Sequence, residues 1–390
     1  MIRRVGGPYD SPSLRSGLDR SRSPASSHRR APSEFASNVV AIQRGSELDA
    51  LKLHSSLVYD TKHSVNEFSE LGPQAATVSP AILLHALTDN ATSDVGALEG
   101  AMAYEACQVE ALGSEEARLD CVADKAFANL GAMMASRVEG VVSVELCVEN
   151  LASLSDEDAA EAFVAKALRM RSMFEEIGVD PERVLLKIPA TWAGIQAVAT
   201  LEREMRVRCH VTQVYCLEQA ALAVDAGATL IQTYVGRVRV WYKNHPVNAV
   251  HNNLADAPDA GVELARQIYA LTKQKCGGGD EAKRAKVIAA SVKTKHDATL
   301  LAGCDFVLLN DRVINNLNAT LANGEKPIVD AFASATCPAV AEPLTREKFE
   351  KALERSPAKE EMAYALKNAA AADARLKEWI KEAVLSGVGQ

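Results

Sequence analysis

The chain has 390 residues, of which 48% are hydrophobic, 24% are charged and 5% are aromatic. This composition is typical of a globular enzyme or binding protein, and it excludes a small module held together by disulfides. The 43 Lys and Arg against 51 Asp and Glu give a net charge of −8, which provides no long-range attraction to nucleic acid or anionic lipid. The nearest candidate for a membrane span, Ala81 to Leu87, is far too short and contains His85. We therefore expect no nucleic-acid partner and no membrane partner.

Residues 1–47 differ in composition from the rest of the chain. They are rich in Ser, Arg and Pro, as in SPSLRSGLDRSRSPASSHRRAPS, and they contain few aliphatic side chains. Such a segment buries too little apolar surface to order itself, which predicts a disordered extension. Its many arginines also fit an organellar transit peptide, although the helical amphipathicity of such peptides is weak here. The expected location is cytoplasmic, or organellar if the extension is a transit peptide.

From Leu57 onward, short β-branched or aliphatic runs alternate with longer segments of helical periodicity. This alternation is typical of parallel βα units. The candidate strands, in chain order, are SLVYD ending at Asp60, QAATVS ending at Ser79, GVVSVEL around Glu145, RVLLKIP around Lys187, VRCHVTQ around Thr212, ATLIQTY ending near Tyr234, KVIAASV ending near Val292 and CDFVLLN ending at Asn310.

The helices between these strands have clear ends. One apolar face repeats at spacings of three and four from Phe163 to Ile177 and stops at Gly178, and the segment from Leu217 to Ala226 is followed by Gly227. Residues 346–384 are charged and rich in Ala, which predicts one or two helices packed outside the core. Eight βα units favour a (β/α)8 TIM barrel over residues 48–390 with extra C-terminal helices, and an open doubly wound sheet is the alternative.

The eight cysteines include no Cys-x-x-Cys pair, and several lie in apolar runs. A thiol there serves as a small hydrophobic side chain. This usage predicts that all eight are reduced, and hence that the protein is intracellular.

Polar residues recur at the carboxyl ends of the predicted strands, where barrels of this kind build their active sites. Lys187 is the most informative of them, because it lies inside the apolar run VLLKIP. Burial of a charged lysine is costly, so desolvation would lower its pKa and favour the neutral amine that forms a Schiff base with a carbonyl. The alternative is a structural lysine in a salt bridge, with its head in solvent. The full set is Asp60, Thr77, Glu145, Lys187, Thr212, Gln232, Ser291 and Lys293.

Two segments, KIPATWAGIQAVATLE and TQVYCLEQAALAVDAGATLIQTYVGRVRVWYK, closely resemble the transaldolase family. VYDT, TVSP, VSVE, AASVK and LAGCDF occur in the order that the family has them, so the resemblance covers Leu57 to Val384. It implies a Schiff-base enzyme that needs no metal or cofactor and transfers a dihydroxyacetone unit between sugar phosphates, as in the pentose phosphate pathway. It also allows a homodimer.

The resemblance implies a role for each matching residue. Lys187 matches the Schiff-base lysine, and Asp60 matches the acid/base that deprotonates the substrate hydroxyl during carbon–carbon cleavage. Glu145 and Thr212 match the pair that handles protons, through a water, as the carbinolamine loses hydroxide.

The phosphate-binding residues of the family are matched less closely. Arg237 in Val-Gly-Arg stands where the family has a phosphate-binding arginine. Ser291-Val292-Lys293 stands where the family has Ser-Phe-Arg, so Lys293 keeps the positive charge but lacks the forked geometry of arginine.

Three departures fall among residues expected to contact the sugar hydroxyls. Ser79 and His210 replace asparagines, and Gln232 replaces a serine. A site built for particular hydroxyls leaves groups unpaired when its partners change, which favours an altered carbonyl substrate as one alternative. We expect His210 to hydrogen-bond the substrate, because no second histidine stands at metal-ligand spacing.

Tyr234 stands where most transaldolases have phenylalanine. The related fructose-6-phosphate aldolases carry a tyrosine that positions water, so release of dihydroxyacetone by an aldolase is an alternative to transfer. The simpler interpretation is a hydroxyl that faces solvent. A catalytically silent protein that only binds sugar phosphate is the third hypothesis.

Overall fold

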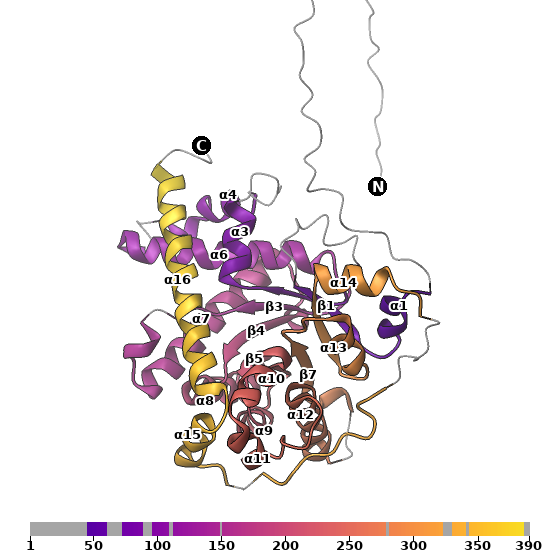
Figure 1. The fold of residues 1–390 in the computed structure, drawn as a ribbon. Helices are drawn as coiled ribbons and strands as arrows, with labels where there is room; N and C mark the ends of the chain where they lie inside the picture. The colour runs from indigo at the N-terminus through magenta and orange to yellow at the C-terminus, as the bar shows by residue number, and fades with distance from the viewer. Residues whose placement is uncertain are drawn as a thin grey trace, which may run out of the picture. The chain divides into compact units, whose positions relative to one another are not determined.

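A computed structural model of the protein describes residues 45–60, 72–88, 96–108, 112–148, 150–277, 281–322, 330–340 and 343–385. Its centre is a sheet of eight parallel strands (Figure 1). The strands are β1 (Ser56–Asp60), β2 (Ala76–Val78), β3 (Val142–Glu145), β4 (Val184–Pro189), β5 (Cys209–Val214), β6 (Leu230–Tyr234), β7 (Lys286–Ala290) and β8 (Phe306–Asn310). Each of the eight predicted strands is confirmed.

The sheet curls into a nearly closed barrel. Its strand order is β1-β8-β7-β6-β5-β4-β3-β2, and β1 pairs with β8 along its whole length. The remaining seam joins β1 to β2 through one bridge, Val58 to Ala75. Gln74 strengthens this seam, because its backbone N–H donates to the Leu57 carbonyl at 3.2 Å and its side-chain oxygen accepts from the Leu57 N–H at 2.8 Å. The (β/α)8 TIM barrel is confirmed, and the doubly wound alternative is wrong.

Helices connect the strands and lie around the barrel (Figure 1). The predicted helix end at Gly178 is confirmed, since this residue has a φ of 85° after the last turn, and Gly227 ends its helix in the same way with a φ of 94°. The helices are α1 (Glu47–Lys52), α3 (Pro80–Thr88), α4 (Gly96–Met102), η2 (Glu105–Cys107), α6 (Glu115–Ala135), η3 (Leu151–Ser153), α7 (Asp156–Ile177), η4 (Pro181–Arg183), α8 (Trp192–Arg203), α9 (Leu217–Ala226), α10 (Val235–Asn244), α11 (Pro246–His251), α12 (Ala260–Cys276), η5 (Glu281–Lys283), α13 (Lys295–Leu300), α14 (Asp311–Asn318), α15 (Arg346–Glu354) and α16 (Ala358–Leu385).

The core fills the barrel wall and the layer between strands and helices. Every residue of β4, β5 and β6 is buried, including the polar residues among them. The helices approach each other closely where side chains are small. A Cβ on Gly131 of α6 would lie 2.7 Å from the ring of Phe174 on α7, so only glycine permits this contact.

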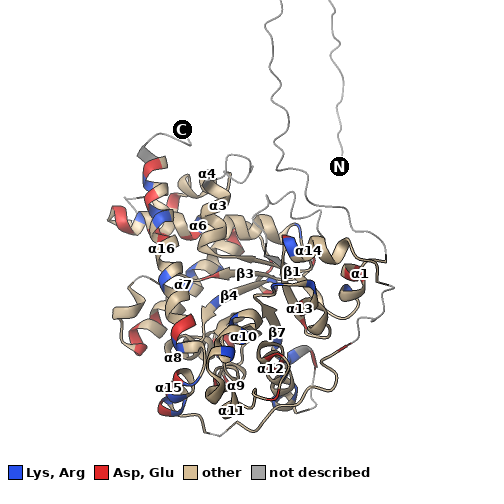
Figure 2. Ribbon diagram, in the orientation of Figure 1, with Lys and Arg blue, Asp and Glu red and all other residues tan. Residues whose placement is uncertain are grey.

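The segment 346–384 forms two helices, α15 and α16, as predicted. The long helix α16 packs against α3 and α6 and also reaches β5. Leu376 and Ile380 are fully buried on its inner side. Charges of both signs are distributed along this helix (Figure 2). The helix is therefore amphipathic, with its apolar side against the barrel.

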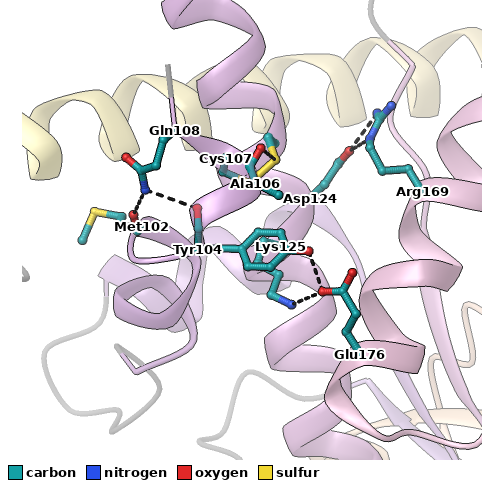
Figure 3. The surroundings of a disulfide bond; sticks show 10 residues. Met102, Tyr104, Ala106, Cys107, Gln108, Asp124, Lys125, Arg169 and Glu176 are labelled. Atoms are coloured by element: carbon teal, nitrogen blue, oxygen red, sulfur yellow. Dashed lines mark hydrogen bonds and ion pairs between the residues drawn. A yellow bond between two sulfur atoms is a disulfide. The ribbon is translucent and has the colours of Figure 1, made fainter. Parts of the chain in front are cut away.

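A disulfide joins Cys107 of η2 to Cys121 of α6 (Figure 3), with 5.3 Å between their Cα atoms. The prediction that all eight cysteines are reduced is wrong for this pair, and the other six remain thiols. The pairing arises because the short helix η2 packs on α6. Next to the disulfide, the Tyr104 hydroxyl donates to Glu176, and the Lys125 amine lies 4.1 Å from the centre of the Tyr104 ring.

The predicted extension, residues 1–47, lies outside the described residues except at its last three positions. There the Ser46 side chain accepts a hydrogen bond from the Asp49 N–H and caps α1. In the part of the chain that the structure describes, none of the helices has the length and apolarity required to cross a bilayer.

Candidate active site

Lys187 and Glu145 face each other across neighbouring strands at the carboxyl end of the barrel. They are register partners on β4 and β3, and the Lys187 Nζ lies 3.1 Å from the Glu145 Oε2. Only 7% of Lys187 is exposed, so its amine does not reach bulk solvent. The two charges compensate part of the cost of burying each other. This geometry differs from the solvent-exposed structural lysine that was the alternative interpretation.

His210 is the register partner of Lys187 on the other side, on β5. It is 1% exposed, and its Nδ1 lies 2.6 Å from the Ser143 hydroxyl. Burial, followed by the nearby charge of Lys187, lowers the pKa of His210 well below its usual value. The imidazole is therefore neutral at physiological pH. His210 lines a cavity in the barrel interior together with Gln232 and with Thr77, whose buried hydroxyl has no hydrogen-bond partner among the described residues.

Thr212 and Tyr234 form a second polar pair beside the lysine. The Thr212 Oγ1 lies 2.7 Å from the Tyr234 hydroxyl, which also accepts from the Gln213 Nε2 at 3.2 Å. Tyr234 is only 8% exposed, so the interpretation of its hydroxyl as solvent-facing is wrong. Burial raises the pKa of Tyr234, which keeps the phenol protonated and able to donate.

Gln213 and Tyr215 belong to this network but were not predicted from the sequence. The pairing of β5 with β6 shifts between Val211 and Val214, and Gln213 has a φ of 62° within that irregularity. The Tyr215 hydroxyl donates to the Gln213 Oε1 at 2.7 Å, and the Tyr215 and Tyr234 rings stack with their centres 5.3 Å apart. The available signal was Gln213 directly after Thr212, two adjacent polar residues inside the strand sequence HVTQVY.

Arg237 lies in the first turn of α10, directly after β6. Its guanidinium is 5.0 Å from the centre of the Tyr234 ring, and its Nη1 donates to the Tyr215 hydroxyl at 3.3 Å and to the Glu361 Oε2 at 3.1 Å. Burial alone lowers the pKa of Arg237, but the two tyrosines and Glu361 raise it overall. Glu361 was not predicted from the sequence, and it comes from the distant helix α16.

Ser291 and Lys293 follow β7 and lie beside the start of α10. The Ser291 carbonyl accepts from the Gly236 N–H at 3.2 Å, and a Cβ on Gly236 would lie 2.5 Å from that oxygen, so glycine is required there. Ser291 has a φ of 59°, and its buried hydroxyl has no partner among the described residues. Lys293 is exposed. Ser291 and Lys293 thus lie beside the helical turn that carries Arg237.

Two further predicted site residues lie at or just after the ends of β1 and β2. The backbone of Asp60 pairs with Asn310 at the end of β1, and its side chain lies outside what the structure describes. The Ser79 hydroxyl accepts from the Ile82 N–H at 3.4 Å at the start of α3, so it serves as a helix cap. Across the described residues, no group of three or more His, Cys, Asp or Glu side chains is arranged to hold a metal ion.

Comparison with known proteins adds to this geometry. The model of the transaldolase/fructose-6-phosphate aldolase family matches residues 57–378. The chain belongs to this family. It is 32% identical to the transaldolase of Homo sapiens over 295 residues, which is 74% of this chain and 79% of the human one. The transaldolase of Shewanella sp. (strain W3-18-1) is 29% identical over 336 residues, 86% of this chain and 97% of its own. The activity is accordingly of the transaldolase type, and the enzyme is a transferase.

Proposed function

We propose that the protein is a cytoplasmic transaldolase of the pentose phosphate pathway type, which transfers a dihydroxyacetone unit between sugar phosphates through a Schiff base on Lys187. The observation that carries the proposal is the buried amine of Lys187, 3.1 Å from the Glu145 carboxylate at the strand ends. A nucleophilic amine needs a nearby group that removes its proton, and Glu145 is in contact with it.

Formation of the Schiff base uses this pair and Thr212. Transfer of a proton from the Lys187 ammonium to Glu145 gives a neutral amine, which attacks the ketone carbon of the donor. The resulting carbinolamine loses its hydroxyl group as water when Glu145, through a water held by Thr212, returns the proton. The product is a protonated imine. Thr212 is suited to this task because its hydroxyl is buried beside the Tyr234 phenol.

Cleavage of the carbon–carbon bond then uses the imine and Asp60. The protonated imine withdraws the electron pair of the bond while the Asp60 carboxylate takes the proton of the neighbouring hydroxyl, and an aldehyde leaves. The enamine that stays on Lys187 attacks an acceptor aldehyde, and the steps reverse. The role of Asp60 rests on the family resemblance and on its place at the end of β1. Arg237, Lys293 and Ser291 would hold the phosphate, because Arg237 is in the first turn of α10 and the other two lie beside that turn.

Borohydride reduction tests the proposal. Wild-type enzyme incubated with fructose 6-phosphate and borohydride should gain a stable adduct on Lys187, which peptide mass spectrometry locates. The Lys187→Arg variant keeps a cation beside Glu145 but cannot form a Schiff base, so it should fold and show no adduct. A wild-type enzyme that binds sugar phosphate without forming the adduct would instead be a silent binder.

A second function, aldolase-type release of dihydroxyacetone, is favoured by the hydroxyl of Tyr234. This hydroxyl contacts Thr212 and Gln213. From this position beside Thr212, the Tyr234 hydroxyl could hold a water that hydrolyses the imine. Tyr234→Phe should then lower the rate of dihydroxyacetone release at least tenfold while transfer to an aldehyde acceptor stays within about threefold. Product analysis with and without acceptor measures both rates. An equal loss of release and transfer would remove the case for an aldolase.

A further inference from the structure

Glu361 reaches from the first turn of α16 to the arginine of the proposed phosphate site. Its Oε2 accepts from the Arg237 Nη1 at 3.1 Å, and the two side chains are 28% and 34% exposed. The ion pair is therefore partly shielded from water, which strengthens the interaction of these charges compared with a fully exposed pair. The Tyr215 oxygen accepts from the same Nη1 at 3.3 Å, while the Tyr215 proton is donated to the Gln213 Oε1.

The start of α16 is anchored to the barrel on both sides of this carboxylate. The Glu360 carboxylate accepts from the Trp241 Nε1 at 3.2 Å, and the Met362 sulfur lies 3.3 Å from the Gln219 Nε2. Ala358, at the first position of the helix, is fully buried. The contacts of its neighbours thus hold the helical turn of Glu361 beside Arg237.

A phosphate dianion arriving at Arg237 meets this negative charge. The strongest phosphate contacts of arginine use two N–H groups of its fork, and one arm of this fork is engaged by Glu361. The second cation of the site, Lys293, supplies a point charge without a fork. We propose that Glu361 is a specificity-determining residue, which weakens binding of the phosphate end and so shifts the enzyme's preference toward donors with less negative charge. This inference rests on the proposed function, because it assigns Arg237 to the phosphate.

Calorimetric titration with inorganic phosphate tests the proposal without requiring turnover. Glu361→Gln keeps the size of the side chain and removes its charge, so the Kd for phosphate should fall about fivefold at low ionic strength. Glu360→Gln is the matched control, because it removes the same charge from the same helical turn but next to Trp241, and its Kd should stay within about twofold of wild type. In an Arg237→Met background, Glu361→Gln should lose its effect.

Opposite results would overturn the proposal. An unchanged or higher Kd for phosphate in Glu361→Gln would show that the carboxylate only positions Arg237. An equal fall in Kd in Glu360→Gln would show a general charge effect. Glu361→Ala provides a second variant if the glutamine side chain disturbs the docking of α16, which urea unfolding would detect. Borohydride trapping on Lys187 tests the proposed function separately. Failure of the proposed function is therefore distinguishable from failure of the Glu361 proposal in the phosphate titration.

The kinetic consequence gives an independent readout. If Glu361 opposes the phosphate, the KM for fructose 6-phosphate should fall about fivefold in Glu361→Gln relative to the KM for unphosphorylated fructose. A parallel change in both KM values would contradict a role in phosphate selection.

Discussion

His210 shows how the barrel interior controls the charge of a single residue. Its imidazole is surrounded by β-strand side chains and touches Ser143, while Lys187 supplies a positive charge on the neighbouring strand. Both conditions oppose protonation, and both lower the pKa of His210. The ring can therefore share a hydrogen bond with Ser143 without adding a second cation beside the amine.

The lowered pKa predicts a pH-dependent contribution of His210 to stability. In the unfolded chain, the histidine takes up a proton below a pH of about 6.5, whereas the folded protein resists this until the pH is much lower. The stabilisation is thus complete above about pH 6.5 and is lost as the pH falls, by up to about 1.4 kcal/mol per unit. Urea unfolding at several pH values from about 5 to 7 should show a flatter profile for His210→Asn than for wild type. Parallel profiles would mean that His210 is protonated in the folded state.

Several site residues could be predicted one by one from the sequence, because each stands in an apolar strand where a polar side chain is costly. Lys187, Glu145 and Thr212 were found in this way, and the structure brings Lys187 into contact with Glu145. Glu361 could not be found, because it pairs with a residue 124 positions away and its helix was predicted only to pack outside the core. No local pattern encodes such a contact.

At the scale of elements, the strands and the ends of helices were accessible from periodicity and from glycines, but the packing of short elements was not. Cys107 and Cys121 meet because η2 lies against α6 (Figure 3). Their separation of 14 residues is not diagnostic of any pairing, since it spans a short helix, a connection and the start of a long helix. The disulfide thus follows from tertiary packing.

Removal of this disulfide should destabilise the protein. Closing a loop of about this length restricts the unfolded chain by roughly 3 kcal/mol. The double variant Cys107→Ala, Cys121→Ala should therefore lose about 2–4 kcal/mol of unfolding free energy in urea, and reductant should lower the stability of wild type but not that of the variant. Alanine is preferred to serine, because Cys107 is fully buried and a hydroxyl there would need a partner. Equal stability of the oxidised wild type and the variant would contradict this assignment.

At the scale of the whole molecule, the barrel depends on the seam between β1 and β2. Most neighbouring strands share several register pairs, but this seam has one bridge and the side chain of Gln74. The Gln74 amide takes the place of a missing ladder bond, because its oxygen accepts the Leu57 N–H that a longer β2 would have paired. Gly140 completes the arrangement by donating its N–H to the Gln74 carbonyl at 3.0 Å.

Gln74→Ala should open this seam and leave the Leu57 N–H without its acceptor. The expected loss of unfolding free energy is about 1–3 kcal/mol, as for other unsatisfied partly buried groups. Gln74→Glu retains an acceptor at the same reach and should lose less, and Gln196→Ala, at an exposed position of α8, should be neutral. Hydrogen exchange at the Leu57 amide would locate the effect. Uniform exchange rates in all three variants would show that the seam does not need the side chain.

The six cysteines outside the disulfide divide into two groups by depth. Burial raises the pKa of Cys147, Cys209, Cys216 and Cys304, whereas Cys276 and Cys337 are partly accessible. The thiolate is the nucleophile that attacks an alkylating reagent, so the four buried thiols should not be labelled while the protein keeps its native packing. These four cysteines lie near β3, near β8 and at both ends of β5. The order in which they become labelled under mild denaturant would therefore show which part of the barrel unfolds first.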